Sequence, residues 1–387
     1  MTETTSARTS ESVAAFAERA RTWLADTMPR IDPNDPPYAD RGDEASWQHV
    51  RELQRRLYDG GFTGICFPTE YDGLGLDIEY QKAFDAESAC YEMPLILNTP
   101  TFTICCATIL DTGSEDQKRQ HIPAALRGDE VLVQLLSEPS GGSDLAGVIT
   151  RAERRGDNWV INGAKTWSTG AFAADYGLLL ARTNWDVPKH EGLTMFLVSM
   201  ASPGITLRRI KQVNGSTEFC EEFLDDLEIS NDAVVGEVDK GWEVASRQLY
   251  HERRAVGGGS EFASGSGAEN NQEQQPDYHA MVRAVYRGVL DGSLAAAGGS
   301  LIRLFQAEEV ALEIDTALAI AGDAGVVDGP AGLLAVGERY LSRQTAALGG
   351  GTTEMARNVI GERVLGFPRE YAADRGVPFN QVKHNRT

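Results

Sequence analysis

Apolar residues in the first third of the chain recur three and four positions apart, which is the spacing of amphipathic helices. The first stretch runs from Ser10 to Met28, with Ser10 as the candidate N-cap, and a proline-rich link over residues 31–37 ends it. A glycine-rich loop, Gly61–Leu76, follows the second predicted helix. The helices predicted after the first are Trp47–Tyr58, Ile78–Glu92, Pro100–Thr112 and Glu115–Leu126, the last closed by Arg127–Gly128 as a C-cap.

The hydrophobic period changes near residue 131, where short, β-rich, alternating segments begin. Loops that contain Gly, Asn, Asp or Pro separate these segments, and the pattern continues to about Val235. It predicts an all-β middle part. The predicted strands are Val131–Leu136, Thr150–Arg154, Trp159–Asn162, Tyr176–Ala181 and Thr194–Val198.

Helical spacing returns from Gly241 and continues in long patterns over Asp277–Ala297, Gly299–Ile320 and Leu333–Ala347. Residues 257–277 are poor in large apolar side chains and rich in Gly, Ser, Asn and Gln, which predicts an exposed loop between two helices. The order is therefore helical domain (1–130), middle β domain (131–238) and helical domain (239–387), an α+β chain. No predicted strand leads into Gly-x-Gly-x-x-Gly and a helix, so a Rossmann dinucleotide site is not expected.

Composition narrows the class further. The chain has 387 residues, 42% hydrophobic and 24% charged, as in soluble globular proteins. Its net charge of −21 repels phosphate backbones and anionic lipids, so neither nucleic acid nor a membrane is an expected partner. No apolar run approaches the ~20 residues of a membrane span. The five cysteines include no Cys-x-x-Cys, which favours buried thiols in a reducing cytoplasm over disulfides or zinc.

Two segments of the middle part carry the motifs that point to a chemistry. They are LLSEPSGGSD, Leu135–Asp144, and GDNWVINGAKTWSTGA, Gly156–Ala171. Both resemble signature segments of the acyl-CoA dehydrogenase family. Further matches in the same order are GFTGICFPTEYDGLG upstream, Val234-Val235-Gly236 with Gly241-Trp242, and GGGTTEMARNVIGERVLG near the C-terminus. The resemblance implies that family's fold, with an N-terminal helical domain, a middle β-barrel or sandwich and a C-terminal four-helix bundle.

The resemblance also implies an FAD cofactor, and the residue types suit a flavin. A flavin that accepts hydride needs hydrogen-bond donors around its ring to stabilise the developing charge. By the resemblance, Leu135 and Ser137 meet the pyrimidine side, and Ser143 bonds the pyrophosphate or the CoA chain. Thr352 and Glu354 match cofactor-contacting positions near the C-terminus. The remaining matches lie together in one run: Trp167 shields one edge of the ring, Ser168 stands where the family usually has isoleucine and contributes its backbone, and Thr169 donates near N5 or O4.

Taken without its motif, Trp167 would be interpreted as a core aromatic of a β-sandwich. The motif favours the flavin instead.

The catalytic base is displaced from its commonest position in the family. Abstraction of the α-proton of a thioester requires a carboxylate beside the α-carbon. Many members carry it as Glu in Tyr-Glu-Gly-Thr, and here that position is Gly350, followed by Gly351. A second arrangement in the family places the glutamate on the helix after the β domain, which implies Glu252 as the base. A solvent-exposed helix carboxylate is the alternative interpretation of Glu252.

Residues around that base are implied to contact the substrate. They are Tyr250 and Arg253 beside Glu252, Ser143, and the Gly350–Gly351 turn, where the backbone N–H of Gly350 holds the thioester carbonyl. The adjacent His251 is expected to be structural.

Two departures from the family concern assembly. Residues 257–277 contain no Arg-x-x-Phe, and residues 317–325 lack the Gln of Gln-x-x-Gly-Gly, the elements that in homotetramers reach a neighbour's FAD. In these features the chain resembles two-gene dehydrogenases of actinobacterial steroid catabolism, α2β2 heterotetramers that hold two FAD. The implied partners are a second dehydrogenase subunit, or otherwise further copies of this chain, and electron-transferring flavoprotein.

The implied reaction converts an acyl-CoA, with a steroid or another bulky acyl group, to the trans-2-enoyl-CoA. The alternatives are a non-catalytic partner subunit and an oxidase-like enzyme that reacts with oxygen.

Overall fold

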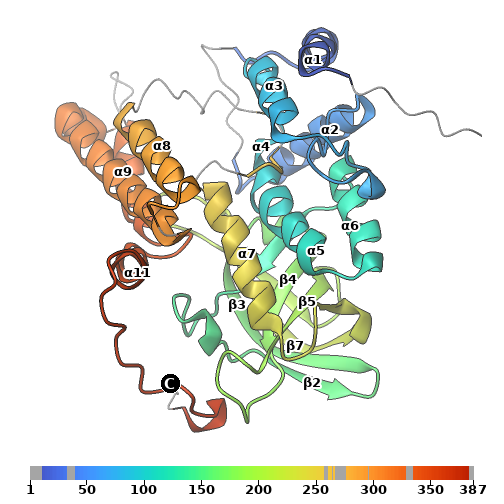
Figure 1. The fold of residues 1–387 in the computed structure, drawn as a ribbon, viewed down its shortest axis with the longest axis vertical. Coiled ribbons are helices and arrows are strands. Elements are labelled where there is room, and N and C mark those ends of the chain that lie inside the picture. Colours follow the sequence, from blue (N-terminus) through green and yellow to red (C-terminus); the bar gives the residue numbers. More distant parts are fainter. Residues whose placement is uncertain are drawn as a thin grey trace, which may run out of the picture.

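The computed structural model describes residues 11–32, 40–256, 260–263, 265, 276–294, 296–327 and 334–382. Within these ranges the chain forms helices, then a β-sheet, then helices again, and α7 lies in the middle of the molecule between the other helices and the sheet (Figure 1). The expected order of elements and fold class are confirmed. The predicted N-cap Ser10, the proline-rich residues 33–37 and most of the predicted loop 257–277 lie outside the described residues.

The N-terminal helices follow the predicted apolar pattern closely. The first helix begins one residue after Ser12, whose side chain accepts a hydrogen bond from the Ala15 N–H, so Ser12 is the cap in place of the predicted Ser10. The last one carries a full capping box at Ser114 and ends at Gly128 with φ 79°, the predicted C-cap. The helices are α1 (Val13–Thr27), α2 (Glu44–Asp59), α3 (Ile78–Ser88), α4 (Leu95–Leu97), α5 (Ala107–Thr112) and α6 (Glu115–Arg127), with a π-helical segment at Asn98–Cys106.

The middle of the chain forms one mixed sheet with the strand order β6-β7-β3-β2-β4-β5-β8, and β1 pairs in parallel with β4. Strand β3 runs to Thr169, well past the predicted end at Asn162, because Gly163 and the buried Lys165 interrupt the apolar alternation without ending the strand. The strands are β1 (Leu132–Leu135), β2 (Arg151–Arg155), β3 (Asn158–Thr169), β4 (Tyr176–Arg182), β5 (Leu193–Ser199), β6 (Ile205–Ile210), β7 (Phe219–Ser230) and β8 (Val234–Val235).

The centre of the sheet is buried on both faces. On β4 and β5, Leu178 and Met195 belong to a core shared with the N-terminal helices, whereas Leu179 and Phe196 belong to a core inside the β domain. Such strands have nearly continuous apolar sequences, which is why the pattern identified them. The segment Leu95–Thr112 is long and apolar enough to cross a membrane by length and composition, but 67% of it is buried within the molecule. It contributes Phe102, among others, to the first of these cores.

The C-terminal helices lie on the other side of α7 from α1, α2 and α3 (Figure 1). Helix α7 spans Gly241–Val256, and the helices that follow it are α8 (Pro276–Leu290), α9 (Gly299–Ala321), α10 (Leu334–Ser342) and α11 (Thr353–Val359). Helix α9 carries many apolar residues, yet only Ser300, Ile302, Ala307 and Ile314 of its 23 residues are buried. Leu312 and Ile320 are exposed by 61% and 83%. Exposed apolar side chains of this size are available for contact with a further surface.

After α11 the chain returns to the β domain as an extended tail (Figure 1). Pro378 forms a β-bridge with Pro188, and the Asn380 side chain donates to Asp186 over 2.6 Å. The buried Arg182 guanidinium lies 3.4 Å from the centre of the Phe379 ring. The tail thereby covers the end of β4 and the loop that follows it.

The cysteines match the expectation of buried thiols only in part. Cys105, Cys106 and Cys220 are buried, Cys66 is half-buried and Cys90 is exposed, and none of them is in a disulfide. The described residues contain no group of three or more His, Cys, Asp or Glu side chains arranged to hold a metal ion.

Candidate active site

Trp167 lies in a β-bulge, where the pairing of β3 with β7 shifts between Thr166 and Ser168. Its backbone is left-handed, with φ 66°, a conformation that costs a bulky residue about 1–3 kcal/mol. Its indole is 57% exposed and meets only the edge of Phe219, with the ring centres 5.8 Å apart. The alternative of a core aromatic is therefore wrong. A strained backbone that presents an exposed indole is typical of a binding surface.

The Trp167 indole forms one wall of a small cavity of about 80 Å³ between the sheet and the N-terminal helices. Thr169, on the same strand, lines it together with Gln134 of β1. The remaining walls are Arg41, Thr99 and Pro100. Two of the residues expected at the flavin ring, Trp167 and Thr169, thus converge on one cavity.

Glu252, the expected base, is connected to this cavity. It lies half-buried on α7, and its Oε2 accepts a hydrogen bond from the Gln134 side-chain amide over 3.0 Å. Burial raises the pKa of the Glu252 carboxyl, while the Gln134 hydrogen bond and the charges of Arg253 and Arg303 partly offset that rise. The alternative of a solvent-exposed helix carboxylate does not describe this environment.

The glycine-rich turn before α11 is bonded to an arginine of α9. Arg303 donates a hydrogen bond of 2.5 Å to the Gly349 carbonyl, and burial lowers the pKa of Arg303 while the charge of Glu252 opposes that change. Gly350 and Gly351 have φ values of 71° and 92°, which L side chains rarely adopt. Arg303 thus bonds the glycine turn and favours the ionised form of Glu252.

Beyond that turn lie the two expected cofactor contacts near the C-terminus. Thr352 caps α11, where its side chain accepts a hydrogen bond from the Met355 N–H. Glu354 is exposed in the first turn of that helix. An exposed carboxylate and a cap hydroxyl are available to a ligand, and both assignments stay predictions.

The remaining expected cofactor residues are Leu135 at the end of β1, Ser137 and Ser143 in the loop after it, and Ser168, which follows Trp167 in the bulge. Leu135 is fully buried in the β-domain core, so only its backbone can meet a ligand. Ser137 is half-buried and its carbonyl accepts from the Thr166 N–H over 3.0 Å, which ties the loop to β3. Ser143 is exposed and is not among the residues that line the small cavity. Ser168 is buried, and its hydroxyl donates to Glu222 over 3.0 Å, whereas only a backbone contribution was expected of it.

The expected substrate residues of α7 are accessible. The Tyr250 side chain is 40% exposed and lies between the guanidinium groups of Arg247 and Arg254, at 4.9 and 5.8 Å from its ring centre. Arg253 is exposed, on the helix turn that carries Glu252. His251 is buried and its Nε2 lies 2.8 Å from Asp111, in agreement with a structural role.

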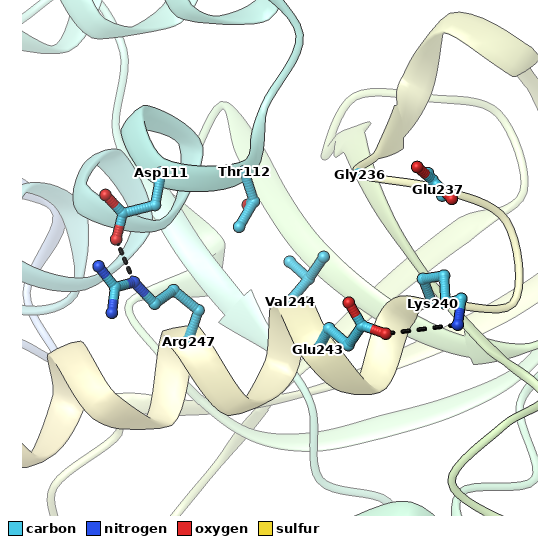
Figure 2. A pocket seen from close by; sticks show the side chains of 8 residues that line it. All are labelled: Asp111, Thr112, Gly236, Glu237, Lys240, Glu243, Val244 and Arg247. Carbon is cyan, nitrogen blue, oxygen red and sulfur yellow. Dashed lines mark hydrogen bonds and ion pairs between the residues drawn. The ribbon is translucent and has the colours of Figure 1, made fainter.

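A larger cavity, of about 570 Å³, lies on another side of α7. Figure 2 shows Asp111 of α5 facing Arg247, and Lys240 facing Glu243, so four of the charged side chains at this cavity form two ion pairs. None of the residues expected at the flavin or at the substrate lines it.

Sequence reasoning missed Gln134, Arg303 and Arg41. Gln134 is separated from Glu252 by 118 positions, so no local pattern joins them. One signal was present: Gln134 is the only polar residue in the apolar run Val131–Leu136. A polar position inside a buried strand usually has a designated partner.

Comparison with known proteins gives the class first. The N-terminal domain model of the acyl-CoA dehydrogenases matches residues 10–129, and their middle-domain model matches residues 134–227. The chain belongs to the acyl-CoA dehydrogenase family, as its motifs indicated. It is an oxidoreductase of a family that acts in lipid oxidation and is generally FAD-dependent.

Two curated relatives from one organism are similar to most of this chain. Acyl-CoA dehydrogenase IpdE1 of Mycobacterium tuberculosis is 31% identical over 382 residues, which cover 93% of this chain and 99% of that protein. Acyl-CoA dehydrogenase FadE34 of the same organism is 32% identical over 344 residues, 82% of this chain, and the match spans only 46% of FadE34.

Two solved structures of complexes are similar over nearly the whole chain. The Tcur3481–Tcur3483 steroid ACAD is 26% identical with a TM-score of 0.70, and covers 93% of this chain and 99% of that one. The ChsE4–ChsE5 complex of Mycobacterium tuberculosis is 25% identical with a TM-score of 0.67, and covers 94% of this chain and 100% of that one.

Proposed function

We propose that this chain is the base-bearing subunit of an FAD-dependent acyl-CoA dehydrogenase, with Glu252 as the catalytic base. The observation that carries the proposal is the hydrogen bond from Gln134 to Glu252. It joins the carboxylate on α7 to the cavity walled by Trp167 and Thr169. This contact supports the proposal because Glu252, Trp167 and Thr169 are assigned to the reaction by motifs far apart in the sequence.

The environment of Glu252 suits proton abstraction from a carbon acid. A carboxylate with a raised pKa is a stronger base, provided that it is still ionised at the working pH. Gln134, Arg253 and Arg303 favour the ionised form, while burial strengthens its basicity. Glu252 takes the α-proton of the acyl thioester, and the Gly350 backbone N–H donates a hydrogen bond to the thioester carbonyl.

The residues fit an isoalloxazine ring. A strained bulge presents the Trp167 face, Thr169 supplies a hydroxyl beside it, and the Ser137 loop is fixed to the same strand. These residues would hold the ring, with Ser168, Thr352 and Glu354 in the positions that the family resemblance gives them. FAD, when bound, would supply the acceptor for the hydride that leaves the β-carbon.

We assign the acyl group to the bulky class, such as a steroid side chain. The similarity to a steroid ACAD supports this assignment. Gly350 also leaves volume where many relatives carry a glutamate. Ser143, Tyr250 and Arg253 are the exposed side chains assigned to the CoA portion.

The partner that we propose is a second dehydrogenase-like subunit in an α2β2 assembly. Two similar solved structures are complexes of two such chains by name. The exposed apolar side chains of Leu312 and Ile320 on α9 offer a place for such a subunit. Electron-transferring flavoprotein is the proposed reoxidant, and the cytoplasm the proposed compartment.

The decisive test is Glu252→Gln. The amide keeps the size and hydrogen-bonding capacity of the side chain but cannot accept the α-proton, so turnover should fall by orders of magnitude while folding and FAD content stay unchanged. Glu243→Gln, on the same helix at an exposed position, is the matched control and should retain turnover.

Near wild-type turnover in the Glu252→Gln protein would contradict the proposal and favour a non-catalytic partner subunit. Rapid reoxidation by oxygen in the absence of electron-transferring flavoprotein would identify an oxidase-like enzyme instead.

A further inference from the structure

The two segments expected at the flavin ring are joined beneath the surface by buried polar groups. The Thr166 N–H donates to the Ser137 carbonyl over 3.0 Å. The Lys165 ammonium, which has no exposed surface, donates to the Leu136 carbonyl over 3.0 Å and to Glu138 over 2.9 Å. A change in the position of Lys165 would therefore shift the loop after β1, to which it is hydrogen-bonded.

Glu222 of β7 lies at the centre of this arrangement and has no role in the reaction described above. Its side chain is fully buried. One carboxyl oxygen accepts the hydrogen bond from Ser168, the residue that follows Trp167 in the bulge. The other oxygen has no hydrogen-bond partner among the described residues. Lys165 is the cross-strand neighbour of Glu222 in the register of β3 and β7.

The buried charges do not balance at Glu222. Glu138 already receives the Lys165 ammonium and the N–H groups of Ile149 and Thr150, which stabilise its ionised form. The Ser168 hydroxyl is the only side chain that donates to Glu222 among the described residues, and the Glu222 backbone also favours its ionised form. Burial raises the pKa of Glu222 to about 7. Lys165 on β3 and Glu221 on β7 act on Glu222 by charge, and Glu222 in turn affects Cys220 on β7. One step further out, Glu138 in the loop after β1 and Arg182 on β4 act on Lys165, and Arg209 on β6 acts on Cys220.

We propose that Glu222 is a positioning residue that couples both flavin-binding segments. It accepts a hydrogen bond from Ser168 in the Trp167 bulge, and it lies across the strand pair from Lys165, which bonds the loop after β1. This inference rests on the proposed flavin site. When Glu222 is neutral, Lys165 stays on the Leu136 carbonyl and the bulge keeps its geometry. When Glu222 is ionised, its unpaired oxygen competes for the Lys165 ammonium, because a buried charge without donors is costly. The loop after β1 then loosens, while the Ser168 bond to the charged carboxylate tightens. The two segments shift relative to each other, and FAD binds more weakly.

The first experiment reads the bulge without FAD. The tryptophan emission of the full-length chain, minus that of Trp167→Phe, is followed between about pH 6 and about pH 8. A transition should appear in the wild type, vanish in Glu222→Gln and persist in Glu221→Gln, the matched control one residue away. The amide that Glu222→Gln introduces keeps an acceptor for Ser168 but cannot ionise. Ser168→Ala should also abolish the transition, because it removes the connection to Trp167.

The second experiment measures FAD affinity by titration, in the assembly in which the chain purifies. The dissociation constant of the wild type should be about tenfold larger at about pH 8 than at about pH 6, the weight of one hydrogen bond, and that of Glu222→Gln should not change with pH. Equal affinity of the wild type at both pH values, or an unchanged transition in Glu222→Gln, overturns this inference and leaves the proposed function intact. Absence of FAD binding at either pH in the assembly with a second dehydrogenase-like subunit overturns the proposed function, and this inference with it.

Discussion

At the scale of single residues, Gln134 controls how readily the proposed base ionises. Its amide donates to Glu252, and this bond favours the carboxylate over the neutral acid against the opposing effect of burial. Because an ionised Glu252 is the form that takes a proton, turnover should fall as the pH drops through its raised pKa. The pH at which turnover falls on the acid side of the pH–rate profile is therefore expected to depend on Gln134 as well as on Glu252.

Replacing Gln134 by methionine tests this dependence. The substitution keeps the length of the side chain and removes the donor, so the pKa of Glu252 should rise further and the acid limb should move upward by roughly one unit. A pH–rate profile of kcat/KM measures the shift, with Gln344→Met at an exposed position as the control. An acid limb that stays in place would show that Gln134 does not set the ionisation of the base.

Motifs identified Glu252, Trp167 and Thr169 because each belongs to a short run whose residue types are tied to one chemistry. They missed Gln134 and Arg303, whose roles depend on contacts across the fold: Gln134 with Glu252 from β1 to α7, and Arg303 with Gly349 from α9 to the last turn. They also missed that the Ser168 side chain bonds to Glu222. Pairings of this kind depend on strand register and helix packing, which a linear pattern does not encode.

At the scale of elements, the turn in which glycine stands at the family's commoner base position has a constrained backbone. Gly350 and Gly351 are left-handed, and the turn leads directly into the Thr352 cap of α11. A glutamate at 350 would have to adopt a backbone that L residues disfavour. The backbone of this turn therefore favours a base on α7.

Gly350→Ala should destabilise the protein by about 1 kcal/mol, since alanine is strained at positive φ. Gly349→Ala is the matched control. Gly349 is not left-handed, and open space surrounds the position of an added Cβ, so the same change there should be neutral or slightly stabilising. Urea unfolding of both variants measures the difference. Equal stabilities would mean that the turn does not require glycine at 350.

Elements themselves were predictable where the apolar spacing was regular, as in α2, α6, β4 and β5. The pattern failed where buried polar residues interrupt it. Lys165 and Glu222 lie inside β3 and β7 as buried ionisable groups, so the end of β3 and the whole of β7 were not recognised as strand. Those interruptions mark the network beneath the proposed flavin site.

At the scale of the whole molecule, the surface indicates an incomplete assembly. Helix α9 and the turn after it expose apolar side chains, with Val326 and Val327 exposed by 62% and 61%. The net charge of −21 opposes random association, so contact at this surface needs a complementary partner. The Arg-x-x-Phe and Gln elements that complete a neighbour's FAD in homotetramers are absent from residues 257–277 and 317–325.

The chain expressed alone should therefore contain little FAD, and co-expression with a second dehydrogenase-like subunit should restore it. The expected product is an α2β2 assembly with about half an FAD per chain, stabilised by the bound cofactor. Absorbance of the flavin and the mass of the assembly measure both quantities. A yellow homotetramer with one FAD per chain and full activity would refute the heteromeric assembly but not the dehydrogenase.

The tail that returns to the β domain also bears on how the chain folds during synthesis. Asp186 and Asn380 are 194 positions apart, so the contact that closes over Arg182 forms only after every helix of the C-terminal region has left the ribosome. The β domain can assemble its strands early, but its last hydrophobic cover, Phe379, arrives late. Until then the Arg182 end of β4 stays accessible to chaperones and proteases, and a nascent chain that stalls in the C-terminal helices exposes it.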